Sequence, residues 1–305
     1  ITEISINRPG ECFVERHGGI ERCALPALTL EHLQRLATLM AYETHQIVDA
    51  QHPLLSAWLP GGQRVQVVLP PACESDRVVM AFRRPSSRQF SLQTLEAAGM
   101  FSDTAIAAPD LLTDDDRQLQ NLLKAQRISE FLEHAVRCRR TIAVSGATAS
   151  GKTTLLNALL RAIPDCERLI TIEDVRELKP VQANCVHLLA SRGGQGVAQV
   201  DVQSLLEAAL RLRPDRIILG ELRGAEASSF LHAINSGHPG SLTSVHADSP
   251  AQAYERLALM VMQGHSTLAH DQIMQLLRAA IDIVVQVAQH GAQRRVVEIA
   301  YRHAA

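Results

Sequence analysis

The chain has 305 residues, of which 46% are hydrophobic and 3% aromatic, and its formal net charge at pH 7 is −2. A chain of this length is expected to form two domains, whose cores aliphatic side chains must fill. Because the net charge is close to zero, the chain as a whole is not attracted electrostatically to nucleic acid or acidic lipid. No apolar run approaches the length of a membrane span. Because the sequence begins at Ile1 rather than at Met, we expect that a native N-terminal segment is missing.

The six cysteines are scattered singly along the chain and form no C-x-x-C pair. Several of them stand among apolar residues. This pattern predicts buried free thiols in a reducing compartment rather than disulfides or a zinc site.

The N-terminal third shows strand and helix patterns together. Alternating apolar residues predict a hairpin that begins in residues 1–13 and turns at Arg8-Pro9-Gly10. Residues 29–45 have helical spacing, with Thr29 as the expected cap. Further strands are predicted at residues 54–59, 65–69 and 77–83. These elements indicate a small α+β domain.

From residue 116 onward, helices alternate with apolar strands. The predicted strands are residues 141–145, 169–173, 186–189, 216–220, 241–245 and 281–287. The predicted helices are residues 118–136, 154–163, 202–212, 225–236, 250–262 and 269–280. This alternation favours a parallel α/β core with helices on both faces. We therefore predict an N-terminal α+β domain in residues 1–101, a linker in 102–116 and an α/β domain in 117–305.

Residues 146–153 match G-x-x-x-x-G-K-[ST], the phosphate-binding loop of P-loop NTPases. An apolar strand pattern precedes the loop and a helical pattern follows it, so a chance glycine-rich turn is disfavoured. Strand, loop and helix together aim backbone N–H groups at a phosphate. Lys152 would bridge the β- and γ-phosphates, and the Thr153 hydroxyl would hold Mg²⁺. The nucleotide-binding residues predicted here are Gly146, Ala147, Thr148, Ala149, Ser150, Gly151, Lys152, Thr153 and Thr154.

Three later strand patterns end in polar residues. One ends at Glu173 and Asp174, the next is followed by Glu221, and the third by His246. The carboxyl ends of strands in a doubly wound sheet lie at one edge, so these groups are expected beside Lys152. We predict His246 to sense the γ-phosphate through a hydrogen bond. The structural alternatives are a solvated strand end or helix cap for each acid, and a structural role for the histidine.

These motifs resemble those of a known family. Residues 172–174 look like the acidic box, residues 210–223 like a variant Walker B motif, and residues 240–247 like the His box of the hexameric traffic ATPases of bacterial type IV secretion. That family is related to the type II secretion and type IV pilus ATPases. Arg8-Pro9-Gly10 and residues 82–86 are also similar to the type IV branch, and the lack of a C-x-x-C pair favours it over type II.

The resemblance implies a RecA-like P-loop domain, a smaller N-terminal domain, and a Mg²⁺-dependent ATPase. Glu173 would position or deprotonate the attacking water, and Glu221 would act through the Mg²⁺ shell, with Thr153 as the other metal ligand. One departure concerns the loop, where Ala147 and Ala149 replace glycines that are usual in the family and narrow the freedom of the backbone.

The resemblance also implies arginines near the nucleotide. Arg213 would lie near the phosphates, and Arg83 or Arg84 would reach the nucleotide from the N-terminal domain. An arginine supplied in trans can raise a hydrolysis rate by about 10³–10⁵. The alternative for Arg83 and Arg84 is a solvated strand end.

The resemblance further implies a homo-oligomeric ring of six subunits at the cytoplasmic face of the inner membrane. It would work with inner-membrane secretion proteins to power assembly of, or transport through, a type IV secretion or conjugation apparatus. Peripheral lipid contact stays open. A type II secretion or pilus motor, and a nucleotide-switched scaffold with negligible turnover, remain alternatives. A DNA translocase is disfavoured because the chain has one Trp, three Tyr and no basic cluster beyond pairs, and no sequence-specific nucleic-acid binding is expected.

Overall fold

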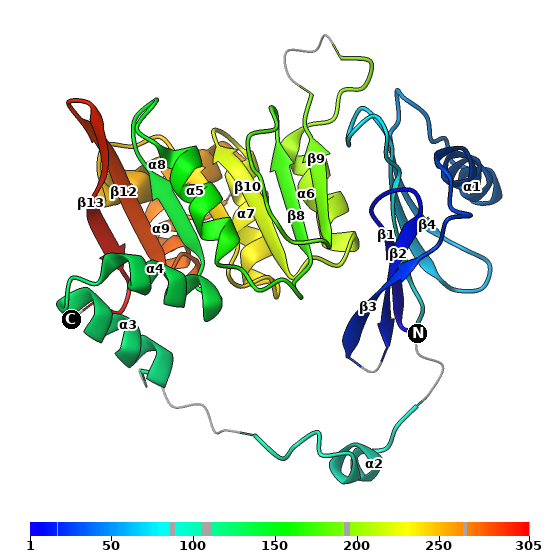
Figure 1. Cartoon of the computed structure of the whole chain (residues 1–305), viewed down its shortest axis with the longest axis horizontal. Coiled ribbons are helices and arrows are strands. Elements are labelled where there is room, and N and C mark those ends of the chain that lie inside the picture. The colour runs from blue at the N-terminus through cyan, green and yellow to red at the C-terminus, as the bar shows by residue number, and fades with distance from the viewer. Residues whose placement is uncertain (17, 86–88, 105–111, 192–195, 265–266, 305) are drawn as a thin grey trace.

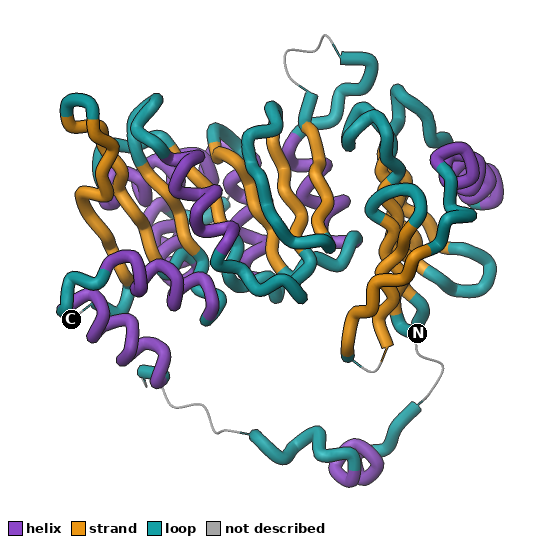
Figure 2. Tube along the Cα trace, viewed as in Figure 1, coloured by secondary structure: helices purple, strands orange, loops and turns teal. Residues whose placement is uncertain are grey.

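The computed structural model describes residues 1–16, 18–85, 89–104, 112–191, 196–264 and 267–304. They contain two β-sheets, one built from the first part of the chain and one from the rest (Figure 1). Figure 2 shows helices layered on both sides of the second sheet. Among the described helices, none combines the length and apolar character that crossing a membrane requires.

The first sheet is antiparallel, with strand order β3-β2-β1-β6-β5-β4. Its strands are β1 (Glu3–Ile6), β2 (Glu11–Arg16), β3 (Gly19–Ala24), β4 (Leu54–Trp58), β5 (Arg64–Val68) and β6 (Val79–Arg83). Helix α1 (Leu30–Glu43) packs on it through Leu33, Ala37 and Met40. The Thr29 hydroxyl accepts a hydrogen bond from the His32 backbone N–H at 3.1 Å, so the predicted helix cap is confirmed.

The second sheet has the order β13-β12-β7-β11-β10-β8-β9 and is parallel except for β13. Its strands are β7 (Ile142–Ser145), β8 (Leu169–Glu173), β9 (Cys185–Leu189), β10 (Arg216–Leu222), β11 (Leu242–Val245), β12 (Ile283–His290) and β13 (Gln293–Tyr301). The predicted parallel α/β core is therefore confirmed.

Helices cover both faces of the second sheet, as predicted. One face carries α3 (Asp114–Lys124), α4 (Ile128–Arg137) and α5 (Lys152–Arg161). The other carries α6 (Val202–Arg211), α7 (Glu226–Asn235), α8 (Pro250–Gln263) and α9 (His270–Ala280). Successive strand residues alternate between the two cores. In β10, Ile218 packs toward α4 and α5 and Ile217 toward α6 to α9.

The predicted helix over residues 118–136 is wrong, because the segment forms two helices. Helix α3 ends at Lys124, and Gln126 in the turn has a φ of +56°. A positive φ cannot continue a right-handed helix. The turn lets Leu119 of α3 and Phe131 of α4 enter the same hydrophobic core, which one straight helix would not allow.

Three elements were not predicted from the sequence: β3, β13 and the short helix α2 (Leu92–Ala97). Strands β3 and β13 each pair with one neighbour only, at the edge of a sheet. Their residues are mostly exposed, so neither carries the apolar alternation that marks a half-buried strand.

The first sheet packs against the β9 edge of the second (Figure 1). The Leu189 backbone N–H donates to the Ala72 carbonyl at 2.9 Å, and Cys73 forms a β-bridge with Leu188. The Arg168 guanidinium, fully buried, donates to the Asn7 side chain at 2.7 Å. Residues 105–111 of the predicted linker lie outside the described residues, so the domain boundaries stay a prediction.

Candidate nucleotide-binding site

The loop between β7 and α5 has a backbone path that depends on glycine. A Cβ atom on Gly146 would lie 2.4 Å from the Val287 carbonyl oxygen, so only glycine fits there. Gly151 caps α5 with a φ of +104°. Ala149 has a φ of +61°, a left-handed conformation in which its Cβ is strained. Of the two alanines that replace family glycines, Ala149 therefore stands where glycine would relieve strain.

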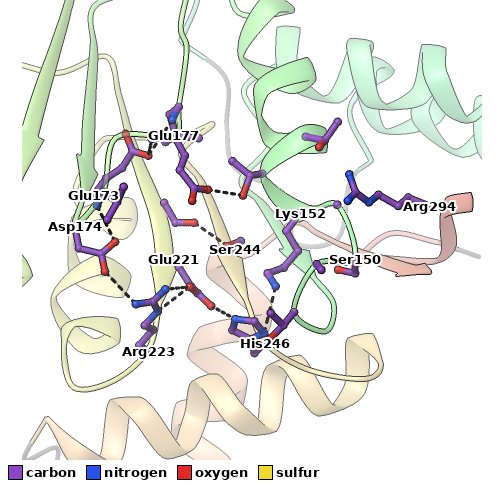
Figure 3. Close-up of a pocket in the computed structure, with 18 residues that line it drawn as sticks. Ser150, Lys152, Glu173, Asp174, Glu177, Glu221, Arg223, Ser244, His246 and Arg294 are labelled. Atoms are coloured by element: carbon purple, nitrogen blue, oxygen red, sulfur yellow. Dashed lines mark hydrogen bonds and ion pairs between the residues drawn. The ribbon is translucent and has the colours of Figure 1, made fainter. Parts of the chain in front are cut away.

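The loop borders a cavity of about 340 Å³ at the carboxyl edge of the second sheet (Figure 3). The predicted residues that line it are Thr148, Ala149, Ser150, Gly151, Lys152, Thr153, Thr154, Glu173, Glu221 and His246. Gly146 and Ala147 contribute carbonyl oxygens that accept hydrogen bonds from Lys152 Nζ at 2.9 and 3.0 Å. The geometry thus brings the P-loop and the three strand-end groups together.

Lys152, His246 and Glu221 form a connected row of polar groups. His246 Nδ1 lies 3.3 Å from Lys152 Nζ, and His246 Nε2 lies 2.5 Å from Glu221 Oε1. Burial and the Lys152 charge lower the pKa of His246, so the ring is neutral at pH 7. The neutral ring accepts a hydrogen bond from Lys152 at Nδ1. Its Nε2 is in contact with Glu221 Oε1, which has no hydrogen-bond partner among the described residues. Burial raises the pKa of Glu221, and the Lys152 charge opposes that shift.

The Arg223 side chain bridges acids at the ends of two neighbouring strands. Its Nε donates to Glu221 Oε2 at 2.7 Å, and its Nη1 donates to Asp174 Oδ2 at 3.0 Å. Asp174 follows β8 and Arg223 follows β10, so the guanidinium spans neighbouring strands. Asp174 was expected at this edge but was given no role, and Arg223 was not predicted as a site residue. Both stand in the motifs that carry the family resemblance.

Glu173 is held by the backbone that follows its own strand. Its Oε1 accepts hydrogen bonds from the N–H groups of Glu177 and Leu178, both at 2.9 Å. Its Oε2 is buried and has no hydrogen-bond partner among the described residues. Burial raises the pKa of Glu173, and the two N–H donors act against that rise. One oxygen is therefore fixed and the other is free to accept a proton.

Oxygen ligands suited to Mg²⁺ lie beside the P-loop. Thr153 Oγ1 donates to Glu177 Oε2 at 3.0 Å, and Glu221 lines the same cavity. Hydroxyl and carboxylate oxygens are the ligands that Mg²⁺ prefers, so the residues fit the ion. Glu177 was missed from the sequence because it follows β8 in an irregular segment.

Comparison with known proteins agrees with this geometry. The profile of the family described as "Type II/IV secretion system protein" matches residues 113–299. The chain belongs to this family. It is 42% identical to the type IV secretion system protein VirB11 of Bartonella quintana, over 98% of this chain and 87% of that protein. It is 44% identical to PtlH of Bordetella pertussis, over 99% and 90%.

A solved structure from the same family matches the whole fold. It is the VirB11 ATPase from the Brucella suis type IV secretion system, in complex with sulphate. The TM-score is 0.91 at 41% identity, and the match covers 99% of this chain and 92% of that one. The RecA-like P-loop fold with a smaller N-terminal α+β part is thereby confirmed.

The arginines that the type II/IV secretion family resemblance implied lie elsewhere in the chain. Arg213 donates to Glu15 from Nε at 3.0 Å and from Nη2 at 2.9 Å. Arg83 lines a separate cavity with Arg213, and the Arg84 backbone N–H donates to the Thr2 carbonyl. Within the described part of one chain, none of these three arginines lines the P-loop cavity. Contact with the nucleotide of a neighbouring subunit stays a prediction.

Proposed function

We propose that this protein is a Mg²⁺-dependent ATPase that powers a type IV secretion apparatus. The observation that carries the proposal is the meeting of Lys152, Glu173, Glu221 and His246 at one cavity beside the P-loop. The relatives named above support the apparatus, because they are type IV secretion proteins that align along nearly the whole chain.

In this mechanism, the P-loop binds the triphosphate and the strand ends act on its terminal phosphate. Lys152 exchanges its contacts with the loop carbonyls for phosphate oxygens. His246 lies within hydrogen-bond distance of Lys152 and senses whether the γ-phosphate is bound. Glu173 Oε2 orients or deprotonates the attacking water, since Oε1 stays bound to backbone N–H groups.

Thr153 and Glu221 would hold the metal, with Glu177 beside Thr153. When bound, Mg²⁺ would neutralise charge on the terminal phosphates. Glu221 can serve the ion only if Arg223 and His246 give up part of their hold on its oxygens. Nucleotide binding would therefore rearrange this row of residues.

We further propose a ring of six subunits at the cytoplasmic face of the inner membrane, bound to inner-membrane secretion proteins. Arg83 or Arg84 would act on the nucleotide of a neighbouring subunit. The bidentate Arg213–Glu15 ion pair joins the two parts of the chain across their boundary. This ion pair can be formed or broken, and hydrolysis would move the N-terminal domain by switching the pair between these two states.

The test is phosphate release and nucleotide binding by the Lys152→Ala variant of the full chain. We expect turnover to be lost and ATP binding to be weakened. Lys124→Ala is the matched control, because Lys124 is exposed at the end of α3, outside the cavity lining. Wild-type protein that binds ATP but releases no phosphate, even as an assembled ring, would instead support a nucleotide-switched scaffold.

A further inference from the structure

The β12–β13 hairpin lies on one side of the P-loop, and the acidic strand ends lie on the other. Strand β12 pairs in parallel with β7, the strand that leads into the P-loop. On its opposite edge β7 pairs with β11, which is followed by β10 and β8. Glu173, Glu221 and His246 all come from that second side. The hairpin therefore borders the end of the site that is farther from the terminal phosphate, where hydrolysis takes place.

The hairpin touches the P-loop at both of its glycines. Val287 of β12 stands over Gly146, as described above. A Cβ atom on Gly151 would lie 3.0 Å from Arg294 Cδ and 3.5 Å from Arg294 Cβ. The aliphatic part of Arg294 thus rests on the residue that caps α5. Figure 3 shows Arg294 at the P-loop, across Lys152 from Glu173 and Glu221.

Arg294 differs from the other cations of the cavity in its contacts. Lys152 donates to loop carbonyls, and Arg223 is bound to Glu221 and Asp174. Arg294 pairs with Gln289 through its backbone in the hairpin, whereas its guanidinium lines the cavity and makes no hydrogen bond or ion pair with the described residues. A guanidinium carries five N–H donors in a planar fork that suits phosphate oxygens. The guanidinium is therefore an available side-chain donor for an anionic ligand, beside the backbone N–H groups of the P-loop.

We propose that Arg294 binds the α-phosphate of the nucleotide, on the side of its nucleoside. This inference rests on the proposed function, because it needs a nucleotide whose terminal phosphate lies between Lys152 and Glu173. A ligand anchored there extends past Lys152 and over the start of α5, where Arg294 stands. The α-phosphate is present in both ADP and ATP, so Arg294 contributes equally to the affinity for each.

The experiment compares Arg294→Ala with Arg295→Ala in the full chain. Arg295 is the matched control, since it is exposed on the same strand, carries the same charge, and its Nε donates to Gln293 Oε1 at 3.1 Å. Side chains of successive strand residues point to opposite faces, so Arg295 points away from the P-loop. Equilibrium titration with fluorescent ADP and with a non-hydrolysable ATP analogue gives the Kd values.

For Arg294→Ala, we expect the Kd of both nucleotides to rise by the same factor, roughly tenfold, as one charge-assisted hydrogen bond is lost. KM for ATP should rise likewise, with kcat within about twofold of the wild type. Arg294→Lys should recover part of the affinity. The Kd values of Arg295→Ala should stay within about twofold of the wild type.

Three results would overturn the inference. The first is an unchanged Kd for both nucleotides in Arg294→Ala, and the second is a rise in Kd for Arg295→Ala as large as that for Arg294→Ala. The third is a loss of affinity confined to the ATP analogue, which would place Arg294 at the γ-phosphate. Failure of the proposed function looks different, because the wild-type protein itself would then release no phosphate from ATP or bind neither nucleotide.

Discussion

Replacing Glu173 with glutamine separates the chemical step from nucleotide binding. The amide oxygen of glutamine can still accept the N–H groups of Glu177 and Leu178, which lie 2.9 Å from Oε1 in the wild type. The amide NH₂ then takes the place of Oε2, which is buried and makes no hydrogen bond to the described residues. The variant therefore keeps the local backbone but has no carboxylate to orient or deprotonate water.

The expected rate loss follows from the role of a positioned base. A general base contributes about 10²–10⁴ to a rate, and each factor of ten corresponds to about 1.4 kcal/mol. We expect phosphate release by Glu173→Gln to fall by about that factor, because Oε2 is the oxygen left free for the water. The Kd for ATP should change by less than about threefold, since the retained contacts hold the segment after β8 in place.

Stability gives a second readout with a defined sign. Burial raises the pKa of Glu173 above its ordinary value of 4.5, so ionisation of this carboxyl destabilises the folded state as pH rises through the raised pKa. Glutamine carries no charge there. The melting temperature of Glu173→Gln should thus equal or exceed that of the wild type at pH 8, and its advantage should shrink as pH falls toward 4.5.

The assay is steady-state phosphate release against pH, with nucleotide titration on the same samples. Wild-type activity should fall as pH drops through the raised pKa of Glu173, because the carboxylate is then protonated. The residual activity of Glu173→Gln should not show this fall at low pH. Turnover by Glu173→Gln within about twofold of the wild type, with ATP binding intact, would refute the assignment of Glu173 as the base.

Two predictions concern stability rather than chemistry. Ala149→Gly should raise the free energy of unfolding by about 0.5–1 kcal/mol in urea titration, because glycine adopts the left-handed φ of +61° without strain. Arg216→Met should lower it by about 3–5 kcal/mol, because the fully buried guanidinium donates to both Glu167 oxygens, at 2.6 and 2.7 Å, and its loss leaves that carboxylate with only the longer 3.6 Å contact to Arg139 Nη2. An Arg216→Met variant as stable as the wild type would contradict the second prediction.

The core of the second domain could be predicted because its signals are local. The P-loop letters determine a strand, a tight loop and a helix start within a dozen residues. Strand β8 ends at Glu173, and Glu221 is the second-last residue of β10. Parallel strands place their carboxyl ends at one edge, so topology alone carries Glu173, Glu221 and His246 to the P-loop. No knowledge of side-chain packing was needed for that step.

Residues whose roles depend on distant contacts were not accessible in this way. Arg294 stands on an exposed edge strand that has no apolar alternation, and only the pairing of β12 with β7 brings it to Gly151. Arg213 was expected near the phosphates from its place before β10. Its guanidinium instead pairs with Glu15, almost two hundred positions away along the chain.

The sequence by itself determined the fold class, the P-loop and the order of polar strand ends, because backbone conformation and hydrophobic periodicity are set by near neighbours. Only the tertiary structure decided which oxygen of Glu173 is free, which acids Arg223 joins, and which cation remains available beside Gly151. The physical reason is that ion pairs and burial depend on which strands lie side by side, and sheet order is a property of the whole chain.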